Sequence, residues 1–305
     1  MEPSETTYCK TMNSGTPAAV DSNSDAIPLP PSTHVGRVRL AVSNLAKSVS
    51  WYTYAIGLKL LDSSRDKLAV LGAHGSNLPL LELEEVPGVR PLGRQTRLGM
   101  YHFAVLLPSR KDLANFIQHL AKDRIEFGAA DHLFSEATYL VDPDGLSVEV
   151  YADRPREQWI RNGDELVGAI DPLNYDELLA EGDGKWNGAP SGTTIGHMHF
   201  YVGDLALASA FYVDGLGFEV MTRMPGALFV SAGGYHHHAG LNTWAARSPV
   251  AGEQDARLLS WELVLPNQAS VDGLTSRLVE QGYPAIEKSA FRDTWGNLVR
   301  LVVES

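Results

Sequence analysis

The chain has 305 residues, of which 44% are hydrophobic and 20% charged, a composition typical of a soluble globular protein. Its 25 Lys and Arg against 37 Asp and Glu give a net charge of −12, which argues against a nucleic-acid or anionic-membrane partner because both are bound through basic patches. No apolar run reaches the ~20 residues that span a bilayer. The one cysteine, Cys9, cannot form a disulfide within the chain. Together these features predict a cytoplasmic protein.

The first 33 residues are rich in Ser, Thr, Pro and Asn and contain few bulky apolar side chains. Such a segment can bury little area, so we expect residues 1–33 to be a disordered tail. Its removal is expected to leave the melting temperature within a few degrees.

The chain repeats itself. Residues 35–60 align without a gap on residues 195–220, and "GRVRLAVSNL" from Gly36 matches "GHMHFYVGDL" from Gly196. Each copy begins with a predicted strand, in which alternate side chains share a face. An Asn or Asp then marks the start of a helix of about ten residues, which a glycine ends. Three short strands follow, so the repeated unit is predicted to be βαβββ.

The same unit recurs within each half. "YHFAVLLPSRKDLANF" and "SWELVLPNQASVDGL" each begin another strand and helix, and the hairpins "DPDG" and "DTWG" correspond. We therefore predict an α+β fold of four βαβββ modules, paired within residues 34–152 and within residues 195–305. Residues 153–194 are predicted to be a linker with turn signals and a short helix near "YDELLAEG".

Four motifs carry a family resemblance: "YHFAVLLP", "DHLFSEATYLVDPDGLSVEVYADRP", "FYVDGLGFEV" and "GGYHHHAGLNTW". With the module boundaries, they resemble the vicinal oxygen chelate superfamily, and within it the two-domain catechol 2,3-dioxygenase-like group. This resemblance implies two incomplete β-barrel domains, each around a cavity. It also implies that metal ligands come from the first and last strands of modules.

Carried onto this sequence, the resemblance implies that His102 and Glu149 are metal ligands, with Tyr139 and His132 close to the reacting groups. The family's remaining histidine would fall at position 37, where this chain has Arg37. A guanidinium stays protonated and offers a metal no lone pair. We therefore expect Arg37 to fill the space of that ligand and to form an ion pair with Glu149.

Arg39 lies two residues on and is expected to face the same cavity as Arg37. Two such arginines need counter-charges or an anionic ligand. This pattern keeps open a metal-independent isomerase, cyclase or lyase, in which Arg37 and Arg39 hold the substrate while Tyr139 or His132 moves a proton. A non-catalytic small-molecule binder is a third reading, because the fold alone does not fix the function.

The second half carries further histidines. His197 occupies the first-strand ligand position, "YHHH" ends at His238, and Glu262 follows on the next predicted strand. His197, His238 and Glu262 therefore form an alternative candidate metal site in the second domain. The opposing interpretation is a buried hydrogen-bonded network of the histidines with Asn242, which would specify the barrel without binding a metal.

The leading functional prediction is an enzyme resembling extradiol ring-cleaving dioxygenases that acts on an aromatic or polyphenolic small molecule. An intact site would use Fe(II) or another divalent metal; the metal-independent alternative would use no cofactor. No nucleic-acid or membrane partner is expected, and a homo-oligomer is left open.

Overall fold

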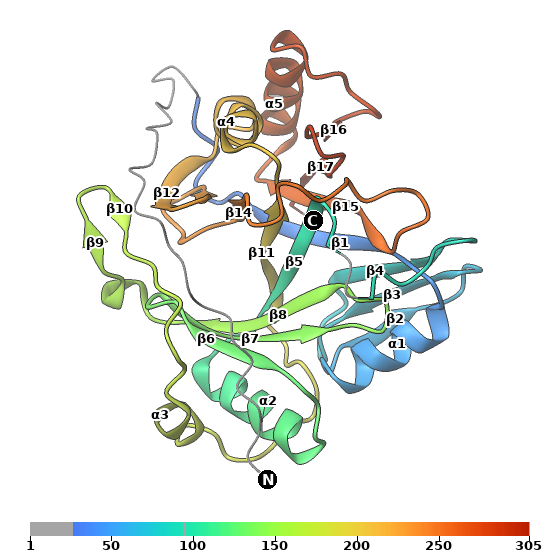
Figure 1. Cartoon of the computed structure of the whole chain (residues 1–305), viewed down its shortest axis with the longest axis vertical. Coiled ribbons are helices and arrows are strands. Elements are labelled where there is room, and N and C mark those ends of the chain that lie inside the picture. The colour runs from blue at the N-terminus through green and yellow to red at the C-terminus, as the bar shows by residue number, and fades with distance from the viewer. Residues whose placement is uncertain (1–26, 94–95, 305) are drawn as a thin grey trace.

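The computed structural model describes residues 27–93 and 96–304, which form an α+β fold of two large curled sheets, a two-stranded sheet and five α-helices (Figure 1). No helix in this part of the chain is long and apolar enough to cross a membrane.

The first two modules have the predicted order of elements. Module 1 consists of β1 (His34–Val42), α1 (Leu45–Tyr54), β2 (Lys59–Asp62), β3 (Leu68–Gly72) and β4 (Pro79–Glu85). Module 2 consists of β5 (Gly99–Leu106), α2 (Arg110–Lys122), β6 (Gly128–Asp131), β7 (Ser135–Val141) and β8 (Ser147–Asp153). The Asn44 side chain accepts a hydrogen bond from the Lys47 N–H and so caps α1, as the sequence predicts.

Modules 3 and 4 follow a linker that contains the predicted short helix. The linker includes β9 (Arg161–Asn162), β10 (Glu165–Leu166) and α3 (Tyr175–Leu179). Module 3 consists of β11 (Thr194–Tyr201), α4 (Leu205–Ser209), a π-helical turn (Ala210–Gly215), β12 (Glu219–Met224), β13 (Ala227–Ser231) and β14 (Ala239–Asn242). Module 4 consists of β15 (Arg257–Leu265), α5 (Gln268–Glu280), β16 (Ala290–Arg292) and β17 (Leu298–Val303). Module 4 has one strand fewer than predicted, because residues 282–289, which connect α5 to β16, form no strand.

The modules do not pair within the halves of the sequence. One sheet has the order β12-β13-β14-β11-β5-β8-β7-β6 and joins modules 2 and 3; the other has the order β16-β17-β15-β1-β4-β3-β2 and joins modules 1 and 4. The predicted domains of residues 34–152 and 195–305 are therefore wrong as units of strand pairing. All four first strands have similar patterns, so the choice of partner depends on contacts between distant residues. One such contact is the ion pair of Arg37 on β1 with Glu262 on β15.

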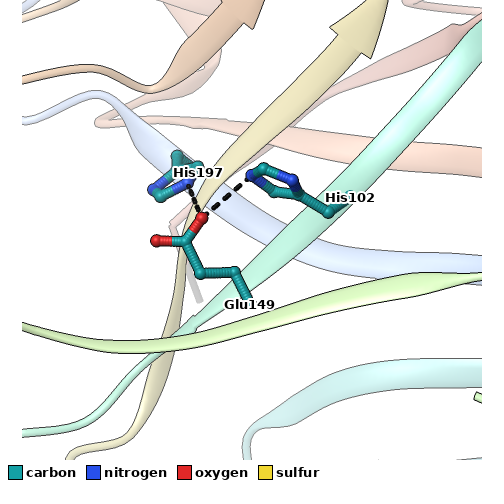
Figure 2. Close-up of side chains that lie close together, drawn as sticks. All are labelled: His102, Glu149 and His197. Carbon is teal, nitrogen blue, oxygen red and sulfur yellow. Dashed lines mark hydrogen bonds and ion pairs between the residues drawn. The ribbon is translucent and has the colours of Figure 1, made fainter. Parts of the chain in front are cut away.

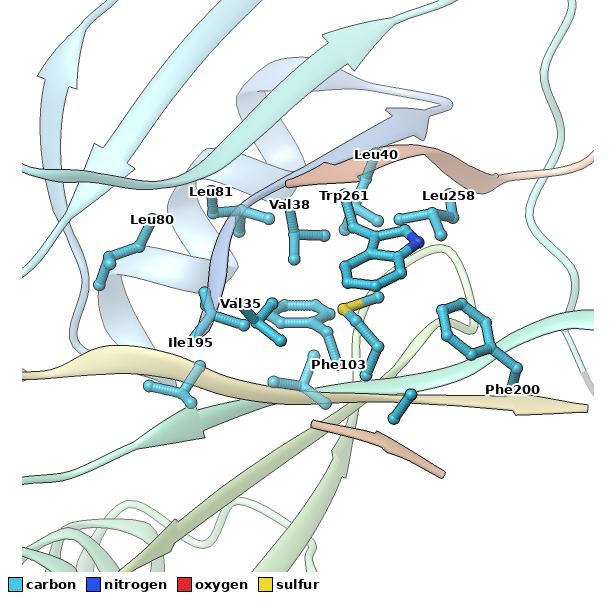
Figure 3. Close-up of a cluster of buried hydrophobic side chains, with 14 of the residues drawn as sticks. Val35, Val38, Leu40, Leu80, Leu81, Phe103, Ile195, Phe200, Leu258 and Trp261 are labelled. Carbon is cyan, nitrogen blue, oxygen red and sulfur yellow. The ribbon is translucent and has the colours of Figure 1, made fainter. Parts of the chain in front are cut away.

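The hydrophobic core lies between the two sheets. Val38 on β1 and Trp261 on β15 face Phe103 on β5 and Phe200 on β11, and all four are fully buried (Figure 3). This packing covers one face of the central strands β5 and β11 and holds them in place. The opposite faces of the same strands are free to carry polar side chains.

Part of the predicted tail packs onto the fold. Leu29 is only 5% exposed, its N–H donates to the Gly217 carbonyl (2.9 Å), and Arg277 donates to the carbonyl of Ile27. Residues 27–33 thus belong to the folded domain, contrary to the prediction, while residues 1–26 lie outside the described part. Residues 27–33 pack onto the domain although they contain few apolar side chains, because the Leu29 side chain is buried in the hydrophobic core.

Two truncations should separate these segments. Removal of residues 1–33 is expected to destabilise the protein by about 2 kcal/mol, since burying one leucine side chain contributes about that amount. Removal of residues 1–26 should leave the free energy of unfolding nearly unchanged. Denaturant unfolding of both truncated proteins beside the full chain measures the difference. Equal stability of the two truncated proteins would contradict the packing role of Leu29.

Candidate metal centre and cavity

Three buried side chains from three adjacent strands of the eight-stranded sheet meet at one point. They are His102 on β5, Glu149 on β8 and His197 on β11 (Figure 2). Glu149 Oε2 lies 2.9 Å from His102 Nε2 and 3.2 Å from His197 Nε2, and the three ligand-type atoms all lie within 4.8 Å of one another. Among the described residues, this is the one group of three or more His, Cys, Asp or Glu close enough to hold a metal.

Strand alternation explains how His197 reaches the site. On β11, Met198 and Phe200 belong to the hydrophobic core, so His197 and His199 point to the opposite face of the strand. His199 on β11 is paired with His102 on β5, and the register shifts beside this pair. A bulge at this position brings Tyr101, as well as His102, to the site's side of the sheet.

The protonation states suit a metal ligand set. Burial lowers the pKa of His102 and of His197 despite the opposing effect of Glu149, which favours the neutral form of both rings. Burial acts to raise the pKa of Glu149, but the neighbouring His197 and His102 outweigh it and hold that pKa well below its usual range. Two neutral imidazoles and an ionised carboxylate are the forms in which these side chains bind metals.

The donor set fits a divalent metal ion. Two histidines and one carboxylate on one side of an ion form the facial arrangement of non-haem iron oxygenases. His102 and His197 each have a buried Nδ1 without a hydrogen-bond partner, and Nε2 of both rings is directed at Glu149. No Lys or Arg among the described residues contacts Glu149, so its charge is left for a cation to balance.

A cavity of about 150 Å³ opens beside the group and is lined by two of its members, His102 and Glu149. Its walls come from β5–β8, from module 3 and from the linker. It is lined by Tyr101, His102, Ala130, His132, Phe134, Tyr139, Glu149, Gly168, Ala169, Ile170, His199, Thr222, Met224, Phe229, His237 and Trp244. None of these described residues is Lys or Arg, so the cavity is mainly apolar and aromatic outside the His–Glu group.

Tyr139 and His132 lie in this cavity as a hydrogen-bonded pair. His132 Nε2 is 2.6 Å from the Tyr139 hydroxyl, and His132 Nδ1 is 2.7 Å from the carbonyl oxygen of Ala169. Since a carbonyl only accepts, Nδ1 carries the proton of the neutral ring and Nε2 accepts from Tyr139. Burial, aided by the charge of Glu149, raises the pKa of Tyr139 well above its usual value, so the hydroxyl stays protonated.

The expected ion pair between Arg37 and Glu149 is wrong. Arg37 lies on the other sheet, where it donates to Glu262 (2.6 Å) and to Glu82 (3.2 Å), and Arg39 binds Glu82 and Glu84. The reason is the pairing of the modules, because β1 lies beside β15 rather than beside β5. Arg37 and Arg39 are therefore absent from the cavity, and their catalytic assignment and the arginine-lined pocket lose their basis.

Glu262 depends on Arg37 for its charge balance, whereas Glu82 is also paired with Arg39 (2.8 Å). The Glu262 side chain is only 16% exposed. Arg37→Met is expected to destabilise the fold by about 2 kcal/mol, because it leaves the largely buried carboxylate of Glu262 without its partner. The double variant Arg37→Met with Glu262→Leu should lose less free energy of unfolding than Arg37→Met alone. Urea unfolding of both variants checks this order, and a double variant less stable than the single one would contradict it.

The alternative triad of His197, His238 and Glu262 does not assemble. Glu262 lies in the other sheet beside Arg37, and His238 Nδ1 is hydrogen-bonded to the Ser231 hydroxyl (2.9 Å). Burial lowers the pKa of His238 to about 3, so it is a neutral core residue.

The other histidines of module 3 form the buried network that the sequence offered as the opposing interpretation. His236 links His237 (2.8 Å) to Asp153 (2.9 Å), and the amide of Asn242 is bonded to His199 (2.9 Å). These bonds hold His199 and His237 at the cavity wall.

Comparisons with known proteins agree with this geometry. The family model for the Glyoxalase/Bleomycin resistance protein/Dioxygenase superfamily matches residues 34–150 and 194–301. The chain belongs to this superfamily. It is 42% identical over 266 residues to a protein of Bacillus subtilis (strain 168) named catechol-2,3-dioxygenase, with 85% of this chain and 93% of the relative covered.

Solved structures share the fold of this superfamily member. A Bacillus subtilis protein provisionally described as a dioxygenase has a TM-score of 0.61 at 12% identity, over 91% of this chain and 86% of the other. Glyoxalase I from Zea mays has a TM-score of 0.53 at 17% identity, over 89% and 92% of the two chains. At such identities the similarity concerns the fold alone.

Several cavity residues were missed by the sequence interpretation. Trp244 lies in the motif "GYHHHAGLNTW", so the motif was noticed but this residue was not. Tyr101 reaches the cavity only through a bulge, and Ile170 only because the linker folds over the sheet. Tyr101 opens the motif "YHFAVLLP", but strand alternation alone would place it on the face opposite to His102, and Ile170 has no local sequence signal.

Proposed function

We propose that this protein is an extradiol ring-cleaving dioxygenase for catechols, in which His102, Glu149 and His197 hold Fe(II). The observation that carries the proposal is the convergence of two buried imidazoles and one buried carboxylate beside an aromatic-lined cavity. The relative named catechol-2,3-dioxygenase supports the reaction class. Iron bound there would supply open coordination positions for a vicinal diol and for dioxygen.

The chain's own residues would bind the ring and hold protons. A cavity of about 150 Å³ matches the size that holds one benzene ring. The Tyr139 hydroxyl stays protonated and donates to His132, whose Nδ1 is fixed by the Ala169 carbonyl. A catechol hydroxyl would pass its proton to the Tyr139 oxygen while the Tyr139 proton moves to His132 Nε2, and the reverse transfer would return a proton to a developing oxyanion.

The proposal is tested by adding Fe(II) to the full chain without oxygen, then supplying catechol and dioxygen. One dioxygen should be consumed per catechol, and the product should be a ring-opened semialdehyde heavier than catechol by two oxygen atoms. The matched control is His102→Ala treated with the same iron. Iron-loaded protein that consumes no oxygen, or that yields a dicarboxylic acid, would overturn the assignment.

A further inference from the structure

We propose that the cavity selects catechols that carry an uncharged, apolar substituent at ring position 4, and that Ile170 and Trp244 hold this substituent at the cavity mouth. The inference rests on the proposed function, because it assumes that the diol end of the ring lies at His102, Glu149 and His197.

The size of the cavity forces a substituent outward. About 150 Å³ is filled by a single aromatic ring. With the two hydroxyls at the His–Glu group, the far edge of the ring carries positions 4 and 5. A group attached there has to leave through the open end of the cavity.

That open end is apolar. Ile170 and Trp244 line the cavity, yet they are 62% and 51% exposed, which places them where it meets solvent. Met224 and Phe229 line the same cavity and are partly exposed. Each methylene that a substituent buries against such a wall should improve binding about fourfold.

The wall with Ile170 is part of a fixed segment of the linker. The adjacent Asp171 pairs with Asp131 through two backbone hydrogen bonds of 2.8 and 2.9 Å, and the Ala169 carbonyl accepts from His132. Ile170 is thus presented by an ordered backbone, while its own side chain is exposed. A substitution there changes the mouth without disturbing the core.

A carboxylate on the substituent would find no partner at this mouth. No Lys or Arg lines the cavity among the described residues. Two arginines of neighbouring segments are already paired: Arg154 with Asp131 (2.6 Å), and Arg223 with Glu165. A carboxylate held against this apolar wall would lose part of its hydration without gaining a cationic partner.

The test compares two substrates of nearly equal size on the iron-loaded full chain. 4-Ethylcatechol and 3,4-dihydroxyphenylacetate differ mainly in a methyl group against a carboxylate. The kcat/KM for 4-ethylcatechol should be at least about tenfold higher. Ile170→Arg should lower this ratio at least about tenfold, since it adds a cation at the mouth. Leu207→Arg is the control, because Leu207 is also largely exposed (53%) and lies outside the cavity lining, and the substitution adds the same charge.

A binding readout on iron-free protein makes the inference independent of turnover. 4-Ethylphenol should bind more tightly than 4-hydroxyphenylacetate by calorimetry, and the preference should shrink in Ile170→Arg but not in Leu207→Arg. Equal or better binding and turnover of the acids by the native chain would overturn the inference and leave the proposed function intact. Failure to cleave any catechol would instead overturn the proposed function. The inference would then be judged by the binding of 4-ethylphenol and 4-hydroxyphenylacetate to the iron-free protein alone.

Discussion

Replacing His197 with alanine is expected to lower the affinity for Fe(II) by more than about 100-fold, because loss of an outer-shell partner of a ligand alone already costs 10–100-fold. The structure brings His197 to His102 and Glu149 from the other half of the sequence. Ring cleavage should fall with metal content. Competition with a coloured chelator measures the affinity, and oxygen uptake measures the turnover.

Two control variants make this result specific. His238→Ala removes a buried histidine of the same module that is bonded to Ser231, so it should keep the native metal affinity even if it is less stable. Arg37→His in the His197→Ala background should restore nothing, because Arg37 lies on the other sheet. Restored iron binding in that double variant would contradict the pairing of modules 2 and 3.

Gly196→Ala is expected to destabilise the protein by about 2–3 kcal/mol, as overpacking of a buried site does. An added Cβ at Gly196 would lie 1.7 Å from the Tyr151 hydroxyl. Tyr151 cannot move aside easily, because it is fully buried, bonded to Tyr235 (2.6 Å) and packed beside His197. The same change should therefore also weaken the metal site. Thermal unfolding and a metal titration measure the two effects.

The matched control is Gly273→Ala in α5. An added Cβ there meets no atom within 4 Å, so the exchange should stabilise the helix by up to about 1 kcal/mol. Adding Tyr151→Phe to Gly196→Ala should recover part of the lost stability, since it removes the closest atom. Gly196→Ala as stable as the native chain would show that β11 can shift without harm to the site.

Much of the site could be predicted because the residues that carry the family resemblance lie close together in the sequence. The resemblance assigned His102, Glu149, Tyr139 and His132, all in motifs of module 2, and the structure places all four at one cavity. The strand alternation that directs their side chains is local. The repeat predicted the modules and their helix starts, and the stretch "YDELLAEG" predicted the short linker helix.

The third ligand could not be assigned because its position depends on which modules pair. The first strands of modules 1 and 3 have the same pattern, and either could have been placed beside β5. The choice is made by distant contacts, such as Arg37 with Glu262 in one sheet and the stacked rings of Tyr101 and Tyr201 in the other. The cavity wall at Ile170 depends likewise on how the linker crosses the sheet.

The arrangement of the metal centre is tested most directly by anomalous X-ray diffraction at the iron edge from crystals of the Fe(II)-loaded full chain. One strong peak per chain is expected between His102 Nε2, His197 Nε2 and the Glu149 carboxylate, with none near Arg37 or His238. A peak at the seven-stranded sheet or at the His236–His238 segment, or no peak beside Glu149 in protein that contains stoichiometric iron, would contradict the proposed centre.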